Sequence, residues 1–241
     1  MLNVPSSLTN SVVLSSLTFL ILFLLIVYFS LKSLKMPRNK ALKFFLMTAL
    51  VLLIWFSAVF LLGQIGFFAK NPLFAPNIIF SFLILFHFLR IAYHSKTVQT
   101  VTDAIPVPWI VGVQTYRIVG IGFIILYTRG LLPAEFAFSA GIGDILVGVT
   151  APFVAILYYL KKSYSRKLAI AWNIIGIVDL VIALSVGILG FSRPVQFLHT
   201  SPSTEILSLF PLVLVPLFAV PLALFLHFSS LRFLRKVNRN L

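Results

Sequence analysis

Long uninterrupted apolar runs dominate this chain, and polar residues gather between them. We expect helices over seven runs: 11–31, 43–64, 76–93, 109–128, 135–160, 167–190 and 206–230. A helix of about 20 apolar residues crosses the roughly 30 Å hydrocarbon layer of a bilayer. The runs are continuous rather than alternating, so they do not fit a transmembrane β-barrel. The pattern predicts an all-α integral membrane protein, a seven-transmembrane-helix bundle that forms a single polytopic domain over residues 1–241.

Composition supports this prediction and narrows the chemistry. The chain is 60% hydrophobic and 10% charged, with a mean hydropathy of +1.08, which excludes an ordinary soluble domain. Cysteine is absent, so disulfides, thiolate metal sites and reactive thiols are excluded. The formal net charge of +14 would suit a nucleic-acid-binding protein, but the placement of the basic residues indicates another role.

The basic residues gather on one side of the expected bundle. All but four of the 19 lysines and arginines fall in or beside the connections on that side. The exceptions are Lys70, Arg129 and Arg193 on the other side, and Arg117 inside a span. Since cytoplasmic loops are rich in Lys and Arg, we expect a multi-pass protein of the cell (inner) membrane, with its N-terminus outside and its C-terminus cytoplasmic. The expected partners of the basic side are anionic lipid headgroups, and nucleic acid is not expected.

Three charged residues interrupt the apolar spans. Arg117, Asp144 and Asp179 lie near the middle of the fourth, fifth and sixth spans. An ionisable side chain at this depth costs several kcal/mol unless it finds a partner or water, so each is a candidate functional residue. Small residues share the helical face of Asp144, which lets neighbouring helices approach closely. We therefore expect Asp144 to face protein and not lipid.

The depths of these residues predict a pair. Arg117 precedes Arg129, and Asp144 follows Pro133, by nearly the same number of residues. At about 1.5 Å per residue both lie roughly 17 Å from the turn between their spans, so an ion pair across antiparallel helices is expected. One arginine against two aspartates leaves a negative site if both ionise, so we expect a shared proton.

Other polar or helix-breaking residues complete the list of candidates. Gln114 shares a face with Arg117, and Asn173 lies in the same span as Asp179, so both are expected at the intramembrane polar site. His87 and His227 are candidates for haem ligation or a proton relay; b-type haem requires two histidines that face each other at similar depth. A hinge is a further hypothesis for the last span, where prolines leave carbonyls unpaired: Pro211, Pro216 and Pro221.

These observations leave two main hypotheses open. The first is a transporter of a small polar solute or a proton, which uses the intramembrane Arg/Asp/Asp cluster. The second is a non-transporting scaffold or assembly protein whose buried charges only fix helix packing. A b-type haem protein is a third, less favoured alternative. We assign no catalytic residue and no metal site, since no HExxH motif is present. The chain is therefore expected not to be an enzyme. Apart from haem, no cofactor is expected.

Overall fold

A computed structural model describes residues 4–70, 74–192 and 196–236, and the side chains of residues 74–81 lie outside this description. Every regular element in these ranges is helical, and no strand occurs in them. In chain order the elements are α1 (Ser6–Ser33), α2 (Arg38–Gln64), α3 (Phe67–Lys70), α4 (Phe74–His94), α5 (Lys96–Asp103), α6 (Val107–Val113), η1 (Gln114–Gly120), α7 (Ile121–Thr128), α8 (Ala134–Tyr159), α9 (Ser165–Leu189), η2 (Thr204–Ser208), η3 (Val215–Ala219) and α10 (Val220–Lys236).

Within the described residues, six helical segments are long and apolar enough to cross a membrane. They are Ser6–Ser33, Arg38–Gln64, Val107–Thr128, Ala134–Tyr159, Ser165–Leu189 and Val215–Lys236. The remaining expected span, 76–93, coincides with α4, whose side chains the structure describes from Phe82 to His94. Many large apolar side chains are exposed, among them Leu14, Ile54 and Phe153. Such a surface is typical of a protein whose solvent is lipid.

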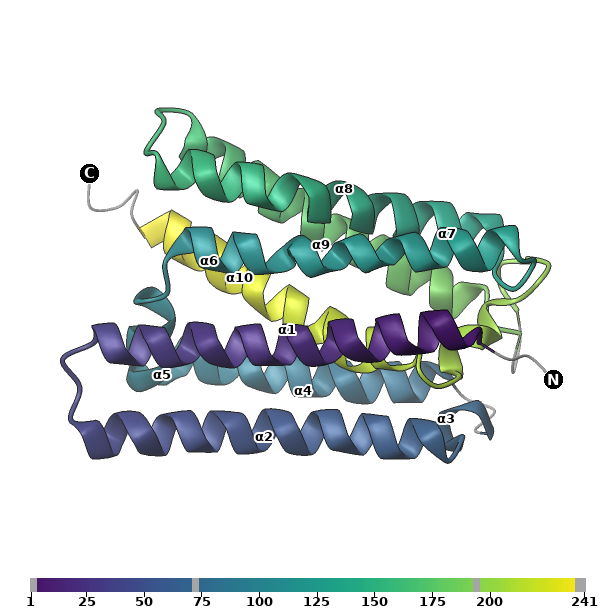
Figure 1. Cartoon of the computed structure of the whole chain (residues 1–241), viewed down its shortest axis with the longest axis horizontal. Helices are drawn as coiled ribbons and strands as arrows, with labels where there is room; N and C mark the ends of the chain where they lie inside the picture. The colour runs from purple at the N-terminus through teal and green to yellow at the C-terminus, as the bar shows by residue number, and fades with distance from the viewer. Residues whose placement is uncertain (1–3, 71–73, 193–195, 237–241) are drawn as a thin grey trace.

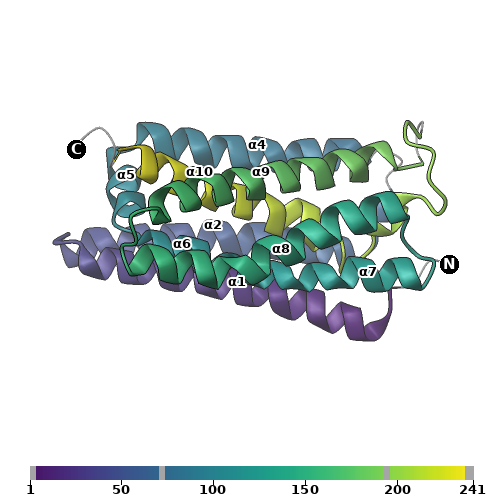
Figure 2. The same ribbon diagram turned by 90° about the horizontal axis from the view of Figure 1, so that it is seen from above.

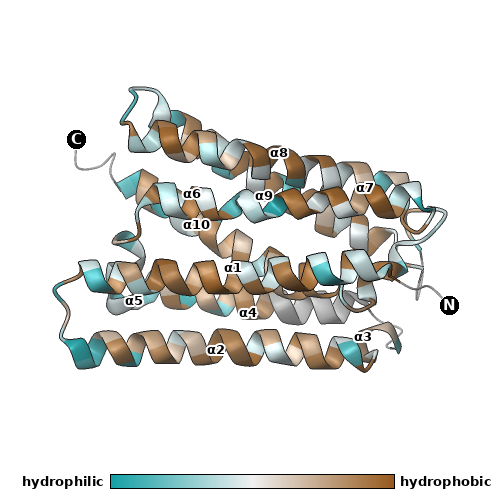
Figure 3. Ribbon diagram, viewed as in Figure 1, coloured by the Kyte–Doolittle hydropathy of each residue, from teal (hydrophilic) through white to brown (hydrophobic). Residues whose placement is uncertain are grey.

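The long helices lie side by side along one axis, and the connections gather at its two ends (Figures 1 and 2). One end holds the α1–α2 connection, α5, the α8–α9 turn and the end of α10; we call it the basic end. The opposite end holds the start of α1, α3, the α7–α8 turn and the segment before η3; we call it the N-terminal end. Hydrophobic residues cover the lengths of the helices, and hydrophilic residues concentrate near the ends (Figure 3). Arg193, expected in a connection at the N-terminal end, lies outside the described residues.

The fourth expected span is helical throughout, but its middle is wound as a 3₁₀-helix. In η1 the buried residues are Gln114, Arg117 and Gly120, each three positions from the next. A 3₁₀-helix has 3.0 residues per turn, so side chains three apart eclipse one another. The tighter winding therefore aligns Gln114 and Arg117 on a single inward-facing row. A mid-helix 3₁₀ segment often marks a functional hinge or a sequence under strain.

The expectation of one continuous helix over 206–230 was wrong. The chain forms the 3₁₀-helix η2, then turns, and becomes a helix long and apolar enough to cross a membrane only from the π-helical η3 onward. Leu214 and Val215 donate their N–H groups to residues three positions back instead of four. The physical reason is the series Pro211, Pro216 and Pro221, since proline has no N–H and clashes with the preceding helical turn. From η3 the segment passes through the centre of the bundle, and 78% of its span is buried.

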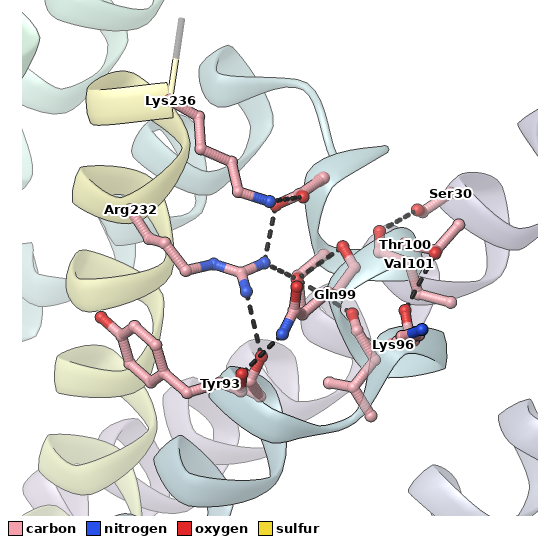
Figure 4. A network of polar contacts seen from close by, with 12 residues as sticks. Ser30, Tyr93, Lys96, Gln99, Thr100, Val101, Arg232 and Lys236 are labelled. Atoms are coloured by element: carbon pink, nitrogen blue, oxygen red, sulfur yellow. Dashed lines mark hydrogen bonds and ion pairs between the residues drawn. The ribbon is translucent and has the colours of Figure 1, made fainter. Parts of the chain in front are cut away.

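Side chains of α10 form hydrogen bonds and ion pairs that link the helices at the basic end (Figure 4). Arg232 donates to the carbonyl of Ala92 at 3.0 Å and to the side chains of Thr102 and Asp103, each at 2.6 Å. Lys236 Nζ lies 2.7 Å from the second Asp103 oxygen. These contacts join α10 to α4 and α5, so the short helix α5 is held across this end of the bundle.

Candidate functional site

Arg117 is the centre of a buried ion cluster. Its Nε donates to Asp144 Oδ1 at 2.6 Å, and its Nη2 donates to Asp179 Oδ2. The arginine side chain is 1% exposed, and those of Asp144 and Asp179 are 15% and 10% exposed. The pair expected from the depth of Arg117 and Asp144 is thus confirmed, and Asp179 joins it. We call Arg117, Asp144 and Asp179 the charge cluster.

Glycines bring the three helices close enough for the cluster to form. A methyl group at Gly148 of α8 would lie 2.7 Å from the backbone nitrogen of Ile118 in η1. One at Gly141 would lie 3.2 Å from the carbonyl oxygen of Gly120. Such distances are shorter than van der Waals contact, so only glycine allows this approach. The small-residue face of α8 therefore packs against η1 and places Asp144 beside Arg117, as expected.

The charges of the cluster do not balance by themselves. Arg117 carries one positive charge, while Asp144 and Asp179 carry two negative charges when both are ionised. An uncompensated charge is costly in a low-dielectric interior, so a cluster of this kind favours the uptake of a positive charge. Two carboxyls that share one arginine titrate as a unit, and a proton bound there belongs to the pair.

A second set of buried polar side chains lies next to the cluster, toward the basic end. His227 Nδ1 lies 2.9 Å from Asn173 Oδ1, and Asn173 Nδ2 donates to Ser230 Oγ at 3.1 Å. Gln114 Nε2 donates to the carbonyl of Ala223 at 3.3 Å, one turn before His227 on α10. All four side chains are at most 1% exposed. We call Gln114, Asn173, His227 and Ser230 the His227 group.

Three polar atoms of these two sets are buried without a partner. Within the described part of the chain, Gln114 Oε1, Arg117 Nη1 and His227 Nε2 have no hydrogen-bond partner. Buried polar atoms in proteins are nearly always paired, so each exception needs an explanation. Arg117 Nη1 is a donor and Gln114 Oε1 is an acceptor, so the unpaired atoms have opposite hydrogen-bonding character.

Two small cavities border the charge cluster on the side of the N-terminal end. Each has a volume of about 30 Å³, enough for one or two water molecules. Both are lined by Asp144, Phe123 and Leu180. The first also reaches Arg117 and the hydroxyl-bearing Ser15, Ser16 and Tyr116, and the second extends to Gly187 and Leu207. Asp144 therefore faces cavities large enough for water and too small for an organic solute.

The structure does not bring the two candidate histidines together. His87 is exposed on α4, whereas His227 is fully buried, with its ring centroid 5.3 Å from that of Trp172. A methyl group at Gly176 would lie 2.6 Å from His227 Nε2, so helix α9 covers the nitrogen that would have to bind iron. The arrangement does not fit a haem held between two histidines. Among the described residues no three His, Cys, Asp or Glu side chains gather as a metal site.

The candidate hinge lies beside the polar site. Pro216 lines the second cavity, and Tyr116 Oη donates to the carbonyl of Ala219 in η3 at 3.5 Å. The two irregular segments η1 and η3 are thus neighbours, and η1 side chains reach backbone carbonyls of the proline-rich span. The irregular backbone of η1 and η3 is covered by protein, the condition under which such backbone is tolerated at membrane depth.

Sequence reasoning missed several residues of the site. Ser230 is one turn after His227 on the same helix, a spacing that could have revealed it. Ser15 Oγ donates to the carbonyl of Val12 in its own helix, and both Ser15 and Ser16 line the first cavity. Nothing in the local pattern marks Tyr116, because its place depends on η3.

Comparison with known proteins places most of this site in a recognised family. Residues 73–235 match the model of a family described as Domain of unknown function (DUF8737). The match includes every residue of the charge cluster and of the His227 group, while α1 and α2 precede it. Neither the curated proteins nor the solved structures contain a significant match.

Proposed function

The chain belongs to the DUF8737 family, and we propose that it is a membrane transporter that handles a proton or a small polar solute at the charge cluster. The observation that carries this proposal is the unpaired Nη1 of Arg117, in a side chain that is 1% exposed and lines a cavity. In a cluster that served packing alone, every buried polar atom should have a partner within the protein. The spare donor and the adjacent cavity support binding of an external species.

The surroundings of the cluster also support transport. Intramembrane carboxylates that face a cavity are typical of proton and ion pathways. Transporter sites near the membrane midplane are typically flanked by interrupted helices, and both η1 and η3 interrupt spans at this level.

The proposed topology has seven spans, with α4 as the third, the N-terminal end outside and the basic end in the cytoplasm. The excess of Lys and Arg at the basic end supports it. Because the chain lacks cysteine, Thr128→Cys and Ser163→Cys give single reporters at opposite ends, both at exposed positions. In intact cells a membrane-impermeant maleimide should label Thr128→Cys and spare Ser163→Cys. The reverse pattern would invert the orientation, and labelling of both or neither would reject it.

We also propose that the basic end contacts anionic lipid headgroups of the cytoplasmic leaflet. A cavity of about 520 Å³ opens there, lined by Arg232, Arg235 and Lys236 together with Tyr93, Gln99, Phe228 and Leu231. Asp103 pairs with Arg232 and Lys236, so the cations around the cavity outnumber this acid. Basic pockets between helices at the cytoplasmic surface suit phospholipid phosphates.

Transport is tested with the purified chain in vesicles. One set contains a trapped pH-sensitive dye under an imposed pH gradient, and a second is followed by swelling in small neutral or zwitterionic solutes. The wild-type protein should give a higher rate of proton or solute flux than empty vesicles in at least one of the two assays. Asp144→Asn or Asp179→Asn should lower that rate by about tenfold or more. Glu135→Gln, at an exposed acid on the same helix, is the matched control and should keep the flux. Wild-type vesicles that match empty ones in both arms would overturn the proposal.

The alternative is a non-transporting protein whose charge cluster fixes helix packing. It is favoured by the two ion pairs that Arg117 makes with α8 and α9 at once. A buried ionic group can specify helix register even where it adds little stability. The stability of charge-cluster variants separates this alternative from transport, as set out below.

A further inference from the structure

The charge cluster and His227 form one set of ionisable groups. His227 contacts α9 at Gly176, and Asp179 lies three positions further along the same helix. Residues three apart on a helix are neighbours, so about one turn separates the imidazole from the Asp179 carboxylate. Arg117 approaches the same carboxylate from η1. Helix α4, which also packs on α10, presents its ionisable side chains at exposed positions and not toward His227; these are His87, Arg90, Tyr93 and His94.

The hydrogen bonds of Asn173 determine which imidazole nitrogen is free. Asn173 Nδ2 donates to the carbonyl of Ala169 at 2.7 Å and to Ser230 Oγ at 3.1 Å. Its Oδ1 must therefore accept, so His227 Nδ1 carries a hydrogen and donates to it. The unpaired Nε2 is then a lone-pair acceptor, and it lies on the face covered by α9. The group is arranged to receive a proton at Nε2.

One added proton would balance the charges of this set. Arg117 with two ionised aspartates has a net charge of −1, and a single added proton makes it neutral. The proton can reside on an aspartate with His227 neutral, or on His227 with both aspartates ionised. Both arrangements are neutral overall, so neither incurs the cost of an isolated buried charge.

The volume of the cavities beside the charge cluster indicates which chemical species can bind there. Ligand pockets for small organic molecules measure roughly 300–1,000 Å³. The two cavities at Asp144 have about 30 Å³ each, which admits water but no solute of that kind. They also lie on the side of the N-terminal end, whereas the His227 group lies toward the basic end. Space for water therefore lies beside Asp144 on one side of the cluster, and the histidine lies on the other.

We propose that the charge cluster binds one exchangeable proton, which moves between the aspartate pair and Nε2 of His227, so that a proton is the species the site handles. In the forward step the O–H bond of Asp179 breaks and leaves its electron pair on oxygen, while an N–H bond forms at Nε2. The products are a carboxylate, stabilised by Arg117, and an imidazolium. This inference rests on the proposed transport function and names its substrate class.

Infrared and NMR spectra of the full chain test the resident proton without any transport assay. Wild type near neutral pH should show either the carbonyl band of a protonated buried carboxyl or a protonated His227 ring. Asp179→Asn removes one negative charge and should abolish both signals. The chain has four histidines, so His227→Gln assigns the ring signal, and His199→Gln, at an exposed loop position, is the matched control. Two ionised carboxylates beside a neutral His227 would overturn the inference, whatever the flux.

The flux assay then separates this inference from the proposed function. With the pH-sensitive dye, His227→Gln should lower proton flux by about tenfold or more, and His199→Gln should leave it unchanged. A resident proton in the spectra with no flux of any kind would refute transport and leave the proton site standing. Solute flux without proton flux would refute the proton as the handled species and retain transport. If His227→Gln fails to fold, the wild-type and Asp179→Asn spectra decide.

Discussion

Gly143 of α8 lies directly against the carboxylate of Asp179 on α9, so that a side chain at position 143 would overlap it. The glycine next to Asp144 thus makes room for the second aspartate, while Asp144 itself turns toward η1. One short segment of α8 therefore serves both acids of the charge cluster. The pair Gly143–Asp179 sets how closely α8 and α9 pack at this level.

Gly143→Ala should therefore displace Asp179 from Arg117. Overpacking a tight site costs roughly 1–3 kcal/mol, and here it also disturbs an ion pair. Gly112→Ala is the control, because a methyl there would lie 3.9 Å from Ala155 Cβ, an ordinary contact. Thermal unfolding in detergent should show a clear loss for Gly143→Ala and little change for Gly112→Ala. Equal midpoints for both variants would contradict the close approach.

Arg117→Ala should be the most destabilising single change in the cluster. It leaves two buried carboxyls without their cation, and removal of one partner of a buried pair costs about 3–5 kcal/mol in soluble proteins. Arg129→Ala, at the exposed end of the same span, should change stability by less than about 0.5 kcal/mol.

Combining Arg117→Ala with Asp144→Asn and Asp179→Asn should restore much of the lost stability, because no buried charge then lacks a partner. Recovery of stability together with loss of a flux that wild type shows would indicate that the charges are retained for transport. A stable Arg117→Ala single variant would instead refute the packing alternative.

Tyr116 contributes mainly through its ring. The ring stacks on Phe19 with centroids 3.9 Å apart, whereas its hydroxyl makes only a long 3.5 Å hydrogen bond to Ala219. Tyr116→Phe keeps the stack, so its midpoint should stay close to that of wild type. Phe19→Ala removes a fully buried ring and should cost about 3–5 kcal/mol. A large loss in Tyr116→Phe would indicate that the hydroxyl has a stronger partner, such as a water in the first cavity.

The basic end should depend more on Arg232 than on Lys236. Arg232 joins α10 to Ala92, Thr102 and Asp103 through a side chain that is 11% exposed, while Lys236 makes one contact and is 51% exposed. Arg232→Gln should lower stability by about 1.5–3 kcal/mol, and Lys236→Gln by less than about 1 kcal/mol. Thermal unfolding of the two variants side by side measures the difference. A larger effect of Lys236→Gln would contradict the network in Figure 4.

Anionic lipid should stabilise the protein through the cavity at the basic end. Phosphatidylglycerol added to the purified chain should raise the unfolding midpoint, and phosphatidylcholine should raise it less. Arg235→Gln removes a cation from the cavity lining, and should reduce the lipid-dependent rise without altering the midpoint in detergent alone. Inorganic phosphate shows whether the headgroup charge suffices without acyl chains. An identical rise in wild type and Arg235→Gln would exclude this cavity as the lipid site.

The sequence by itself determined the helical class and the equal distance of Arg117 and Asp144 from the turn between their helices. Apolar runs of spanning length predict helices because a bilayer core leaves backbone groups no other partner. Equal distance from one turn predicted the pair of Arg117 and Asp144, and the small residues on the face of Asp144 predicted close helix packing. Each of these follows from spacing along one helix or across one short turn, which a sequence records directly.

Only the tertiary structure decided what surrounds the charges. The 3₁₀ winding of η1, the position of η3 beside it and the room that Gly143 leaves for Asp179 depend on helices that meet from distant parts of the chain. The same is true of His227, which a helical pattern places at a depth but not against Asn173 or Gly176. Periodicity fixes the face on which a side chain lies, whereas packing between helices fixes its partner and decides which polar atoms remain free.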